Sequence, residues 1–235
     1  MKKTVKTGAA TTSGPARTRR PTQAERSQAT RECVIAAAIS LLHKEGYSGA
    51  TTLAIRREAD VSMGAMQHQF PTKAELMAAV LERLTGERLA KLEHALRGAE
   101  TPLERIDGLL DAAGALIGSP LFAASMEIQL ARRADEELDE AATRILAPFE
   151  ARFRTMMDEV TAGLDAAIVH KINQFQLLAG ATIRGLTVDV VRGAELATAR
   201  AAFRFWCEMV LRQLADDMAQ AVPAAAKAAK RRVSR

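Results

Sequence analysis

The residues best suited to chemistry with a partner are Met63, Gly64, Gln67 and His68, which repeat at helical spacing directly after Ser62. Serine is a residue type that begins helices, and on the helix that it would cap these four positions point to one side. The opposite side carries Ala65, Met66, Gln69 and Phe70. Glycine lets a backbone approach a duplex closely, and Gln and His side chains can bond base edges or phosphates. The pattern indicates insertion into a DNA major groove, and an ordinary packed helical hairpin remains the alternative.

A second short helix and a tight turn are expected to position that face. Thr51 is the candidate N-cap of this helix, and Asp60 is a residue type that tolerates the left-handed backbone of a turn. The predicted apolar face of the helix comprises Leu53, Ile55 and Ala59. Residues 51–70 therefore form a predicted helix-turn-helix unit.

Two longer helices flank this unit. The first is predicted over residues 23–45 and stops at Gly46, and the second runs from Lys73, after Pro71 and Thr72, to about Arg97. The inward residues of the first are Val34, Ile35, Ala37, Ala38, Ile39, Leu41 and Leu42, and those of the second are Leu76, Val80, Leu84 and Leu92.

The run from Val34 to Lys73 resembles the N-terminal DNA-binding domain of the tetracycline-repressor (TetR) family. The residues that carry the resemblance are Ile35, Ala37, Ala38, Leu41, Leu42, Gly46, Thr51, Ile55, Ala59, Val61, Ser62, Gly64, His68, Phe70 and Lys73. The resemblance implies a bacterial transcription regulator that is a homodimer and has a divergent helical C-terminal domain for a ligand. Three positions depart from the family pattern, namely Arg56, Asp60 and Gln67. At the last of these an amide, which can pair with adenine, replaces a common aromatic residue.

We expect the DNA contacts to come from the helix-turn-helix unit and from the start of the helix after it. Lys73 is expected to meet a phosphate together with the free N–H groups of that helix. The full set of expected DNA-binding residues is Thr51, Ser62, Met63, Gly64, Ala65, Gln67, His68 and Lys73.

Composition predicts an all-α protein with no enzymatic site. Of the 235 residues 48% are hydrophobic but only 4% aromatic, and good helix formers dominate. We find no phosphate-binding glycine loop, metal-ligand spacing or nucleophile motif, so no cofactor and no metal is expected. Cys33 and Cys207 are expected to be small core residues. No apolar run reaches the length of a membrane span, so we expect a cytoplasmic protein without membrane contact.

The charge distribution and the turns suggest four regions. Residues 1–31 carry +7 and residues 222–235 carry +5 within a net charge of +5, so the stretch between them carries −7 and contact with a polyanion is expected to be local. We predict a disordered basic tail over 1–22, the helix-turn-helix domain over 23–73, a helical ligand-binding and dimerisation domain over 74–221, and a second disordered basic tail over 222–235.

The third region is expected to contain five helices. They are predicted over about 102–117, 120–133, 136–164, with a kink at Pro148, 167–192 and 195–221. A ligand cavity is expected to be lined by Leu109, Phe122, Met126, Gln129, Phe149, Phe153 and Phe175, with a filled core as the alternative. An apolar seam for a dimer is expected from Ile172, Phe175, Ile183, Leu186, Leu196, Ala199, Phe203, Trp206, Val210 and Leu214, with packing within one subunit as the alternative.

These expectations combine into one leading function and two rivals. The leading one is a homodimeric regulator, most simply a repressor, that a small and largely apolar ligand releases from a palindromic DNA operator. The first rival is a DNA-architectural protein that binds through its basic tails and has no effector. The second is an all-helical enzyme, which the absence of a catalytic motif disfavours.

Overall fold

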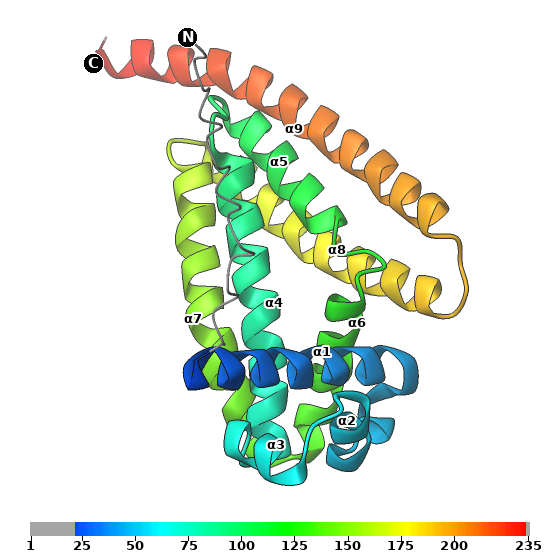
Figure 1. The fold of residues 1–235 in the computed structure, drawn as a ribbon. Helices are drawn as coiled ribbons and strands as arrows, with labels where there is room; N and C mark the ends of the chain where they lie inside the picture. The colour runs from blue at the N-terminus through cyan, green and yellow to red at the C-terminus, as the bar shows by residue number, and fades with distance from the viewer. Residues whose placement is uncertain (1–21, 234–235) are drawn as a thin grey trace, which may run out of the picture.

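The computed structural model describes residues 22–233, and the side chains of residues 22–221. Over that range the chain is helical and has no strand, which confirms the all-α prediction (Figure 1). The helices are α1 (Gln23–Gly49), α2 (Thr52–Glu58), α3 (Met63–Gln69), α4 (Lys73–Leu96), α5 (Pro102–Gly114), α6 (Pro120–Ala131), the 3-10 turn η1 (Arg132–Ala134), α7 (Glu136–Thr161), α8 (Ala166–Val191) and α9 (Leu196–Val233). The predicted tail over 1–22 lies outside the described residues except for Thr22.

Side-chain caps fix where the helices begin, as the sequence predicts. Thr22 and Thr101 each form a capping box, in which the hydroxyl accepts from the third backbone N–H of the helix and a glutamate accepts from the cap residue. Pro102 and Pro120 occupy first-turn positions, where a missing N–H costs nothing. Asp135 caps α7 through its side chain, which accepts from the backbone N–H of Leu138.

Helix ends agree less well with the sequence. The backbone of Gly46 has a φ of 71°, yet helical hydrogen bonding resumes beyond it, so α1 ends at Gly49 after a bend. Helix α7 contains Pro148, is continuous on both sides of it and ends at Thr161. Helix α9 continues to Val233 and not to about Ala221, so residues 222–233 are helical where a tail was expected. Alanine dominates that stretch, and its high helix propensity accounts for the extension.

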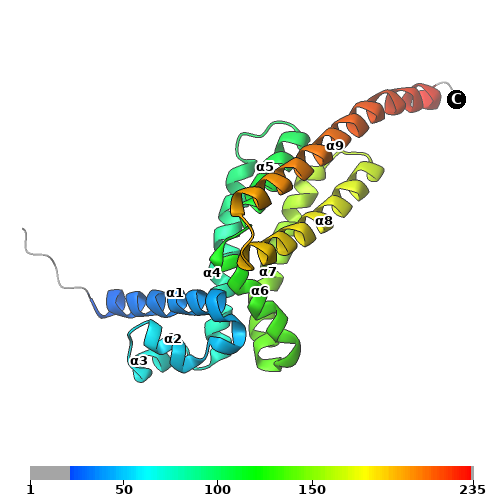
Figure 2. The same cartoon turned by 90° about the vertical axis from the view of Figure 1, so that its right-hand side faces the viewer.

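Two hydrophobic cores divide the chain, and α4 belongs to both (Figures 1 and 2). We call the part built on α1, α2, α3 and the first turns of α4 the head, and the part built on α5, α8, α9 and the later turns of α4 the body. Leu76 and Val80 lie in the head core, whereas Leu84 and Leu92 lie in the body core. Helices α6 and α7 contribute side chains to both cores as well. The head and body are therefore joined by continuous, packed helices.

Two sequence expectations about the core are wrong. Leu53 is 46% exposed although it was assigned to the apolar face of α2, and Cys33 is exposed although it was expected to be a core residue. Two positions on a helix that are two residues apart point to nearly opposite sides, so Leu53 cannot share the buried side of Ile55. Cys207 is buried as expected, and burial raises the pKa of its thiol to about 11. Among the described helices none is both long and apolar enough to cross a membrane.

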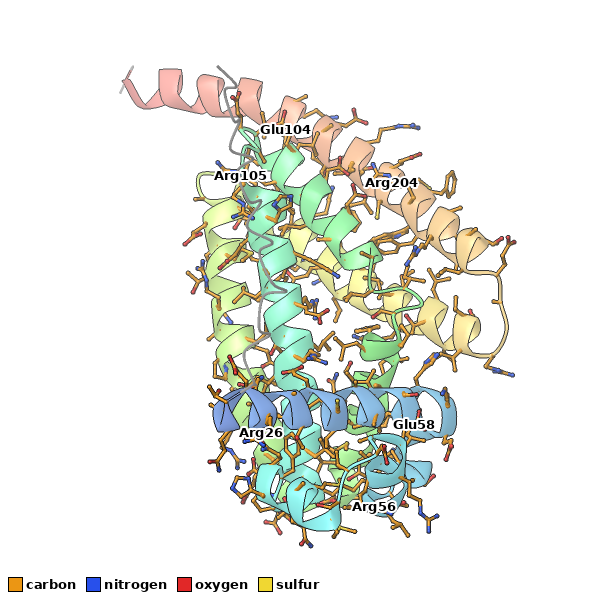
Figure 3. All side chains as sticks on the ribbon, viewed as in Figure 1. Arg26, Arg56, Glu58, Glu104, Arg105 and Arg204 are labelled. Atoms are coloured by element: carbon orange, nitrogen blue, oxygen red, sulfur yellow. The ribbon has the colours of Figure 1, made fainter. Side chains whose placement is uncertain are left out.

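The apolar seam predicted for a dimer lies inside the single chain. Phe203 is 3% exposed and packs beside Gly114 of α5, where an added Cβ would lie 2.9 Å from the Phe203 ring. Arg204 holds α9 on α5 through ion pairs of 3.0 Å to Asp107 and 2.6 Å to Asp111 (Figure 3). The other seam residues are buried or partly buried in the body core: Ile172, Phe175, Ile183, Leu186, Leu196, Ala199, Trp206, Val210 and Leu214. A helical repeat indicates which side is buried but not what covers it, and here the covering is the chain itself.

Candidate nucleic-acid interface

Two hydroxyl caps set the ends of the helix-turn-helix unit. The Thr51 hydroxyl accepts a hydrogen bond from the backbone N–H of Ala54 at 3.1 Å, and the Ser62 hydroxyl accepts one from Ala65 at 3.1 Å. Asp60 has a φ of 51°, so the turn contains the left-handed residue that the sequence predicts. The unit therefore begins and turns at the expected residues.

The guanidinium of Arg56 fastens the turn. It donates a hydrogen bond of 3.2 Å to the backbone carbonyl of Val61, and the backbone N–H of Val61 donates to the carbonyl of Arg56 at 3.3 Å. The sequence marks Arg56 only as a departure from the family pattern and does not predict the turn carbonyl as its partner. Because a carbonyl next to a left-handed residue lacks a helical partner, a long cation from the preceding helix satisfies it.

Helix α3 is held from behind by α1. Met66 and Phe70 are buried in the head core, and the amide of Gln69 donates to the hydroxyl of Ser27 at 2.6 Å. The Arg31 guanidinium lies 4.7 Å from the centre of the Phe70 ring, a cation–π distance. These contacts fix the rotation of α3 about its own axis and hence which side chains it presents outward.

The outward face of α3 has the predicted composition. Met63, Gly64, Gln67 and His68 are exposed, and Ala65 is half-buried. An added Cβ at Gly64 would meet no protein atom within 4 Å, so this glycine opens space on the outside of the molecule and not within it. The caps Thr51 and Ser62 are also exposed, as is Leu53. The face offers hydrogen-bonding groups and apolar groups without charge, which suits the base edges of a groove.

Lys73 does not project freely as the sequence suggested. Its ammonium donates a hydrogen bond of 3.0 Å to the backbone carbonyl of Tyr47 and lies 3.8 Å from the centre of the Tyr47 ring. Desolvation lowers the pKa of Lys73, and the nearby charge of Asp135 opposes that shift. The ammonium is committed to the end of α1, because the bend at Gly46 brings the Tyr47 carbonyl within its reach.

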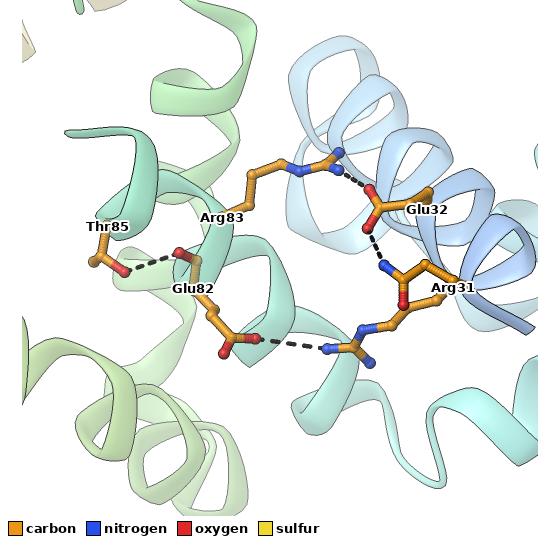
Figure 4. Close-up of polar contacts among 6 residues, drawn as sticks. Arg31, Glu32, Glu82, Arg83 and Thr85 are labelled. Carbon is orange, nitrogen blue, oxygen red and sulfur yellow. Dashed lines mark hydrogen bonds and ion pairs between the residues drawn. The ribbon is translucent and has the colours of Figure 1, made fainter. Parts of the chain in front are cut away.

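Two ion pairs fasten α1 across α4 (Figure 4). Arg31 pairs with Glu82 at 3.6 Å, and Glu32 pairs with Arg83. The amide of Gln28 also donates to Glu32 at 2.8 Å. The pairs are partly exposed, so each adds little stability, but together they resist sliding of the head along α4.

Three cavities divide the residues expected to bind a ligand. Leu109, Phe153 and Phe175 line an inner cavity of about 80 Å³ between α4, α5, α7, α8 and α9. Phe122, Gln129, Phe149 and Phe153 line an outer cavity of about 630 Å³ between α4, α6, α7 and α8. Met126 lines a third cavity of about 130 Å³ beside α1. Sequence reasoning missed Arg88 of α4, which lines both the inner and the outer cavity.

Two polar residues in and just after α6 have partners within the protein. Glu127 accepts a hydrogen bond of 3.1 Å from the backbone N–H of Tyr47 and so ties α6 to the end of α1. Arg132 pairs with Asp139 at 2.8 Å. No group of three or more potential metal-ligating side chains occurs among the residues that the structure describes.

Comparison with known proteins identifies relatives of the head. Residues 34–80 match the family model described as bacterial regulatory proteins of the tetR family. The HTH-type transcriptional regulator CymR of Pseudomonas putida is 33% identical over 126 residues, which are 54% of this chain and 62% of CymR. The chain thus matches less than two thirds of the length of that relative.

Solved structures show the same fold over most of the chain. A transcriptional regulator from Rhodococcus sp. RHA1 superposes with a TM-score of 0.61 at 24% identity, covering 78% of this chain and 96% of that one. The TetR-family regulator SCO4454 from Streptomyces coelicolor gives a TM-score of 0.62 at 15% identity and covers 80% of this chain and 96% of its own. The likeness in fold therefore extends beyond the head into the body, although the identity over the whole superposed region is only 15–24%.

Proposed function

We infer from the match of residues 34–80 to the family model of bacterial regulatory proteins of the tetR family that this chain is a homodimeric regulator of transcription that binds a palindromic DNA operator. The observation that carries the proposal is the outward face of α3, where Met63, Gly64, Gln67 and His68 are exposed together. Such a face gains little from solvent but complements the donors, acceptors and methyl groups of a major groove. The firm attachment of α3 to α1 would present it as a rigid reader.

A dimer is needed because one short helix reads too few base pairs to specify a unique site. Two copies of α3 related by a dyad would read successive major grooves when their centres are roughly 34–36 Å apart. The exposed apolar side chains of α8 and α9 support this assembly, since the two helices lie side by side on one flank (Figure 2). These side chains are Leu177, Leu178, Val188, Val191, Phe205 and Met209, which we call the flank patch.

The flank patch replaces the buried seam as the proposed interface. Leu177, Leu178 and Val188 recur along one side of α8, and Ala181 and Gly185 on the same side are exposed and small. Phe205 is 64% exposed and lies four residues before Met209 on α9. Two antiparallel helices that present apolar side chains outward suit a four-helix contact between identical subunits.

A small ligand would regulate DNA binding from the cavities of the body. The inner and outer cavities lie against α4, and the first turns of the same helix pack in the head core. A ligand that prefers one position of α4 would therefore prefer one spacing of the two heads. Release of the operator on ligand binding, and hence repression, is the simplest form of this coupling.

Salt titration of binding to a selected duplex and to a scrambled duplex of equal length tests the proposal. Specific reading by α3 predicts that the selected duplex binds at least about 10³-fold tighter at physiological salt. A DNA-architectural protein held by its basic tails would bind both duplexes with similar affinity and a similar steep salt dependence. Equal affinities would reject the proposed function.

A further inference from the structure

Arg88 is a cation placed among apolar side chains. It lies on α4 and lines both cavities of the body together with Phe153, Met157 and Gln176. Its guanidinium is 5.2 Å from the centre of the Phe149 ring and 5.9 Å from that of Phe153, and these two rings stack with centres 6.2 Å apart. The aromatic pair supports one face of the guanidinium and leaves its planar edge for a partner.

No anion in the described part of the chain pairs with this guanidinium. The Nε of Arg88 is buried without a hydrogen-bond partner among residues 22–221, and no ion pair to its side chain is found there. Desolvation lowers the pKa of Arg88, and the charge of Arg184 on α8 lowers it further. A partly buried cation whose Nε has no partner and which has no counter-ion is costly, so the arrangement needs another reason to persist.

The walls of the inner cavity indicate what would complete the site. Arg88 is the charged residue of its lining and Gln176 the uncharged hydrogen-bonding one, and the remaining lining residues are apolar. They include Leu109, Ile172, Phe175 and Ile183. The outer cavity adds Gln129 and Asn173 and a second cation, Arg154, but also the carboxylates of Glu150 and Asp158, so its charged groups offset one another and do not favour a highly charged ligand.

We propose that the effector of this protein is an apolar monocarboxylate whose carboxylate binds the guanidinium of Arg88 and whose hydrocarbon part extends along the wall that the inner and outer cavities share at Phe153 and Met157, because the inner cavity of about 80 Å³ is too small to hold it alone. The inference rests on the proposed ligand response and adds the chemical class of the ligand. A guanidinium presents two parallel N–H donors that match the two oxygens of a carboxylate, and the amide of Gln176 can donate as well. One cation facing apolar walls suits a single negative charge.

The position of Arg88 also gives the carboxylate a mechanical role. Arg88 lies on α4 beyond the turns that pack in the head core, whereas Gln176 and Phe175 belong to α8, next to the flank patch. A carboxylate held between the two would connect the helix that leads to the head with a helix of the proposed dimer interface. Binding would thereby favour one position of α4 over others.

Calorimetric titration of the full chain with matched probes tests the inference. The probes are 4-phenylbutyrate and octanoate, each compared with its primary amide, which has the same shape but no charge. We expect each carboxylate to bind at least tenfold tighter than its amide to the unchanged protein. Arg88→Met should weaken carboxylate binding about 10- to 100-fold and leave amide binding as it was. Arg88→Lys keeps the charge but not the two parallel donors. Its affinity for the carboxylates should therefore lie between the affinity of the unchanged protein and that of Arg88→Met.

Arg152→Met is the matched control, because Arg152 lies on α7 outside both cavities and pairs with Glu93 at 3.3 Å on the surface. It should bind both probes like the unchanged protein. Equal affinity of carboxylate and amide for the unchanged protein, no binding of either carboxylate at millimolar concentration, or a carboxylate preference that survives Arg88→Met would each overturn the inference. If Arg88→Met does not fold, the inference is tested by two remaining measurements: the affinities of carboxylate and amide for the unchanged protein, and the affinity of the carboxylates for Arg88→Lys. DNA selection needs no ligand, so failure of the proposed DNA-binding function would be seen separately.

Discussion

At the scale of single residues, the outward face of α3 was predictable and the partners of cations were not. Helical periodicity separates Gln67 and His68 from Met66 and Phe70, and the burial of these residues agrees with it. The partners of Arg56 and Lys73 are backbone carbonyls, which every residue carries and no sequence pattern marks. Arg88 was missed for a related reason, since its isolation depends on which helices surround it.

Gly64→Leu tests whether α3 enters a groove. No protein atom lies within 4 Å of an added Cβ at Gly64, so the variant should fold and be at least as stable as the unchanged protein, because leucine has the higher helix propensity. A leucine there would hold the helix away from the duplex and should cost more than the roughly 1–3 kcal/mol of one lost base contact. Gly86→Leu on α4, which also meets no atom within 4 Å, is the control for helix propensity. Normal operator affinity of Gly64→Leu in a fluorescence anisotropy titration would show that α3 does not approach the bases there.

Lys73→Ala distinguishes the internal contact from a phosphate contact. Loss of the hydrogen bond to the Tyr47 carbonyl and of the ring contact should lower the free energy of unfolding by about 1 kcal/mol. The salt dependence of DNA binding should not change, because the ammonium is already engaged. Lys44→Ala, an exposed lysine of α1, is the control for stability. If Lys73→Ala instead reduces the salt slope of DNA binding by about one unit, Lys73 contacts a phosphate as the sequence suggested.

At the scale of elements, helix starts were predictable because caps are local. Thr51, Ser62, Thr101 and Ser119 each cap a helix whose first N–H groups lie within three residues of them. Helix ends depend on the packing of neighbouring elements: the helical backbone of α1 is interrupted at Gly46, where the sequence predicts its end, but a short helical segment follows it to Gly49. The link between head and body also escaped the sequence, since the contact of α6 with α1 joins residues 80 apart.

Substitutions of Glu127 test that link. Glu127 accepts from the backbone N–H of Tyr47 at 3.1 Å, so Glu127→Ala should leave a partly buried N–H without a partner and cost about 1–3 kcal/mol of unfolding free energy. Glu127→Gln keeps an accepting oxygen and should cost less than half as much. Urea unfolding followed by circular dichroism measures both. Equal losses for the two variants would mean that the charge of Glu127, and not the hydrogen bond, holds the end of α1.

At the scale of the whole molecule, the sequence predicted a paired, apolar α8 and α9, and the seam that it offered to a partner is covered within the single chain, which was the alternative interpretation. Their buried sides pack on α5 and on each other, and the flank patch is what remains outside. Deciding which apolar side faces the partner requires the neighbouring helices, because both sides repeat at helical spacing.

Phe205→Glu and Phe203→Glu separate the two faces. Phe205 is 64% exposed in the single chain, so Phe205→Glu should fold normally but place a charge in the proposed interface and give monomers. Phe203 is 3% exposed, so Phe203→Glu should bury a charge in the body core and unfold the protein. Analytical ultracentrifugation and circular dichroism measure the two outcomes. A Phe205→Glu variant that sediments as a dimer would place the interface elsewhere.

Specific reading of DNA by paired copies of α3 is the central claim, and selection of bound duplexes from a random pool tests it most directly. The account predicts an inverted repeat whose half-site centres are one or more helical turns apart. Gln67→Ala should select the same repeat with lost preference at one position in each half-site, at a cost of about 1–3 kcal/mol. A pool that acquires no common sequence, or a repeat that Gln67→Ala and Gly64→Leu both select unchanged, would contradict the claim that α3 reads the operator.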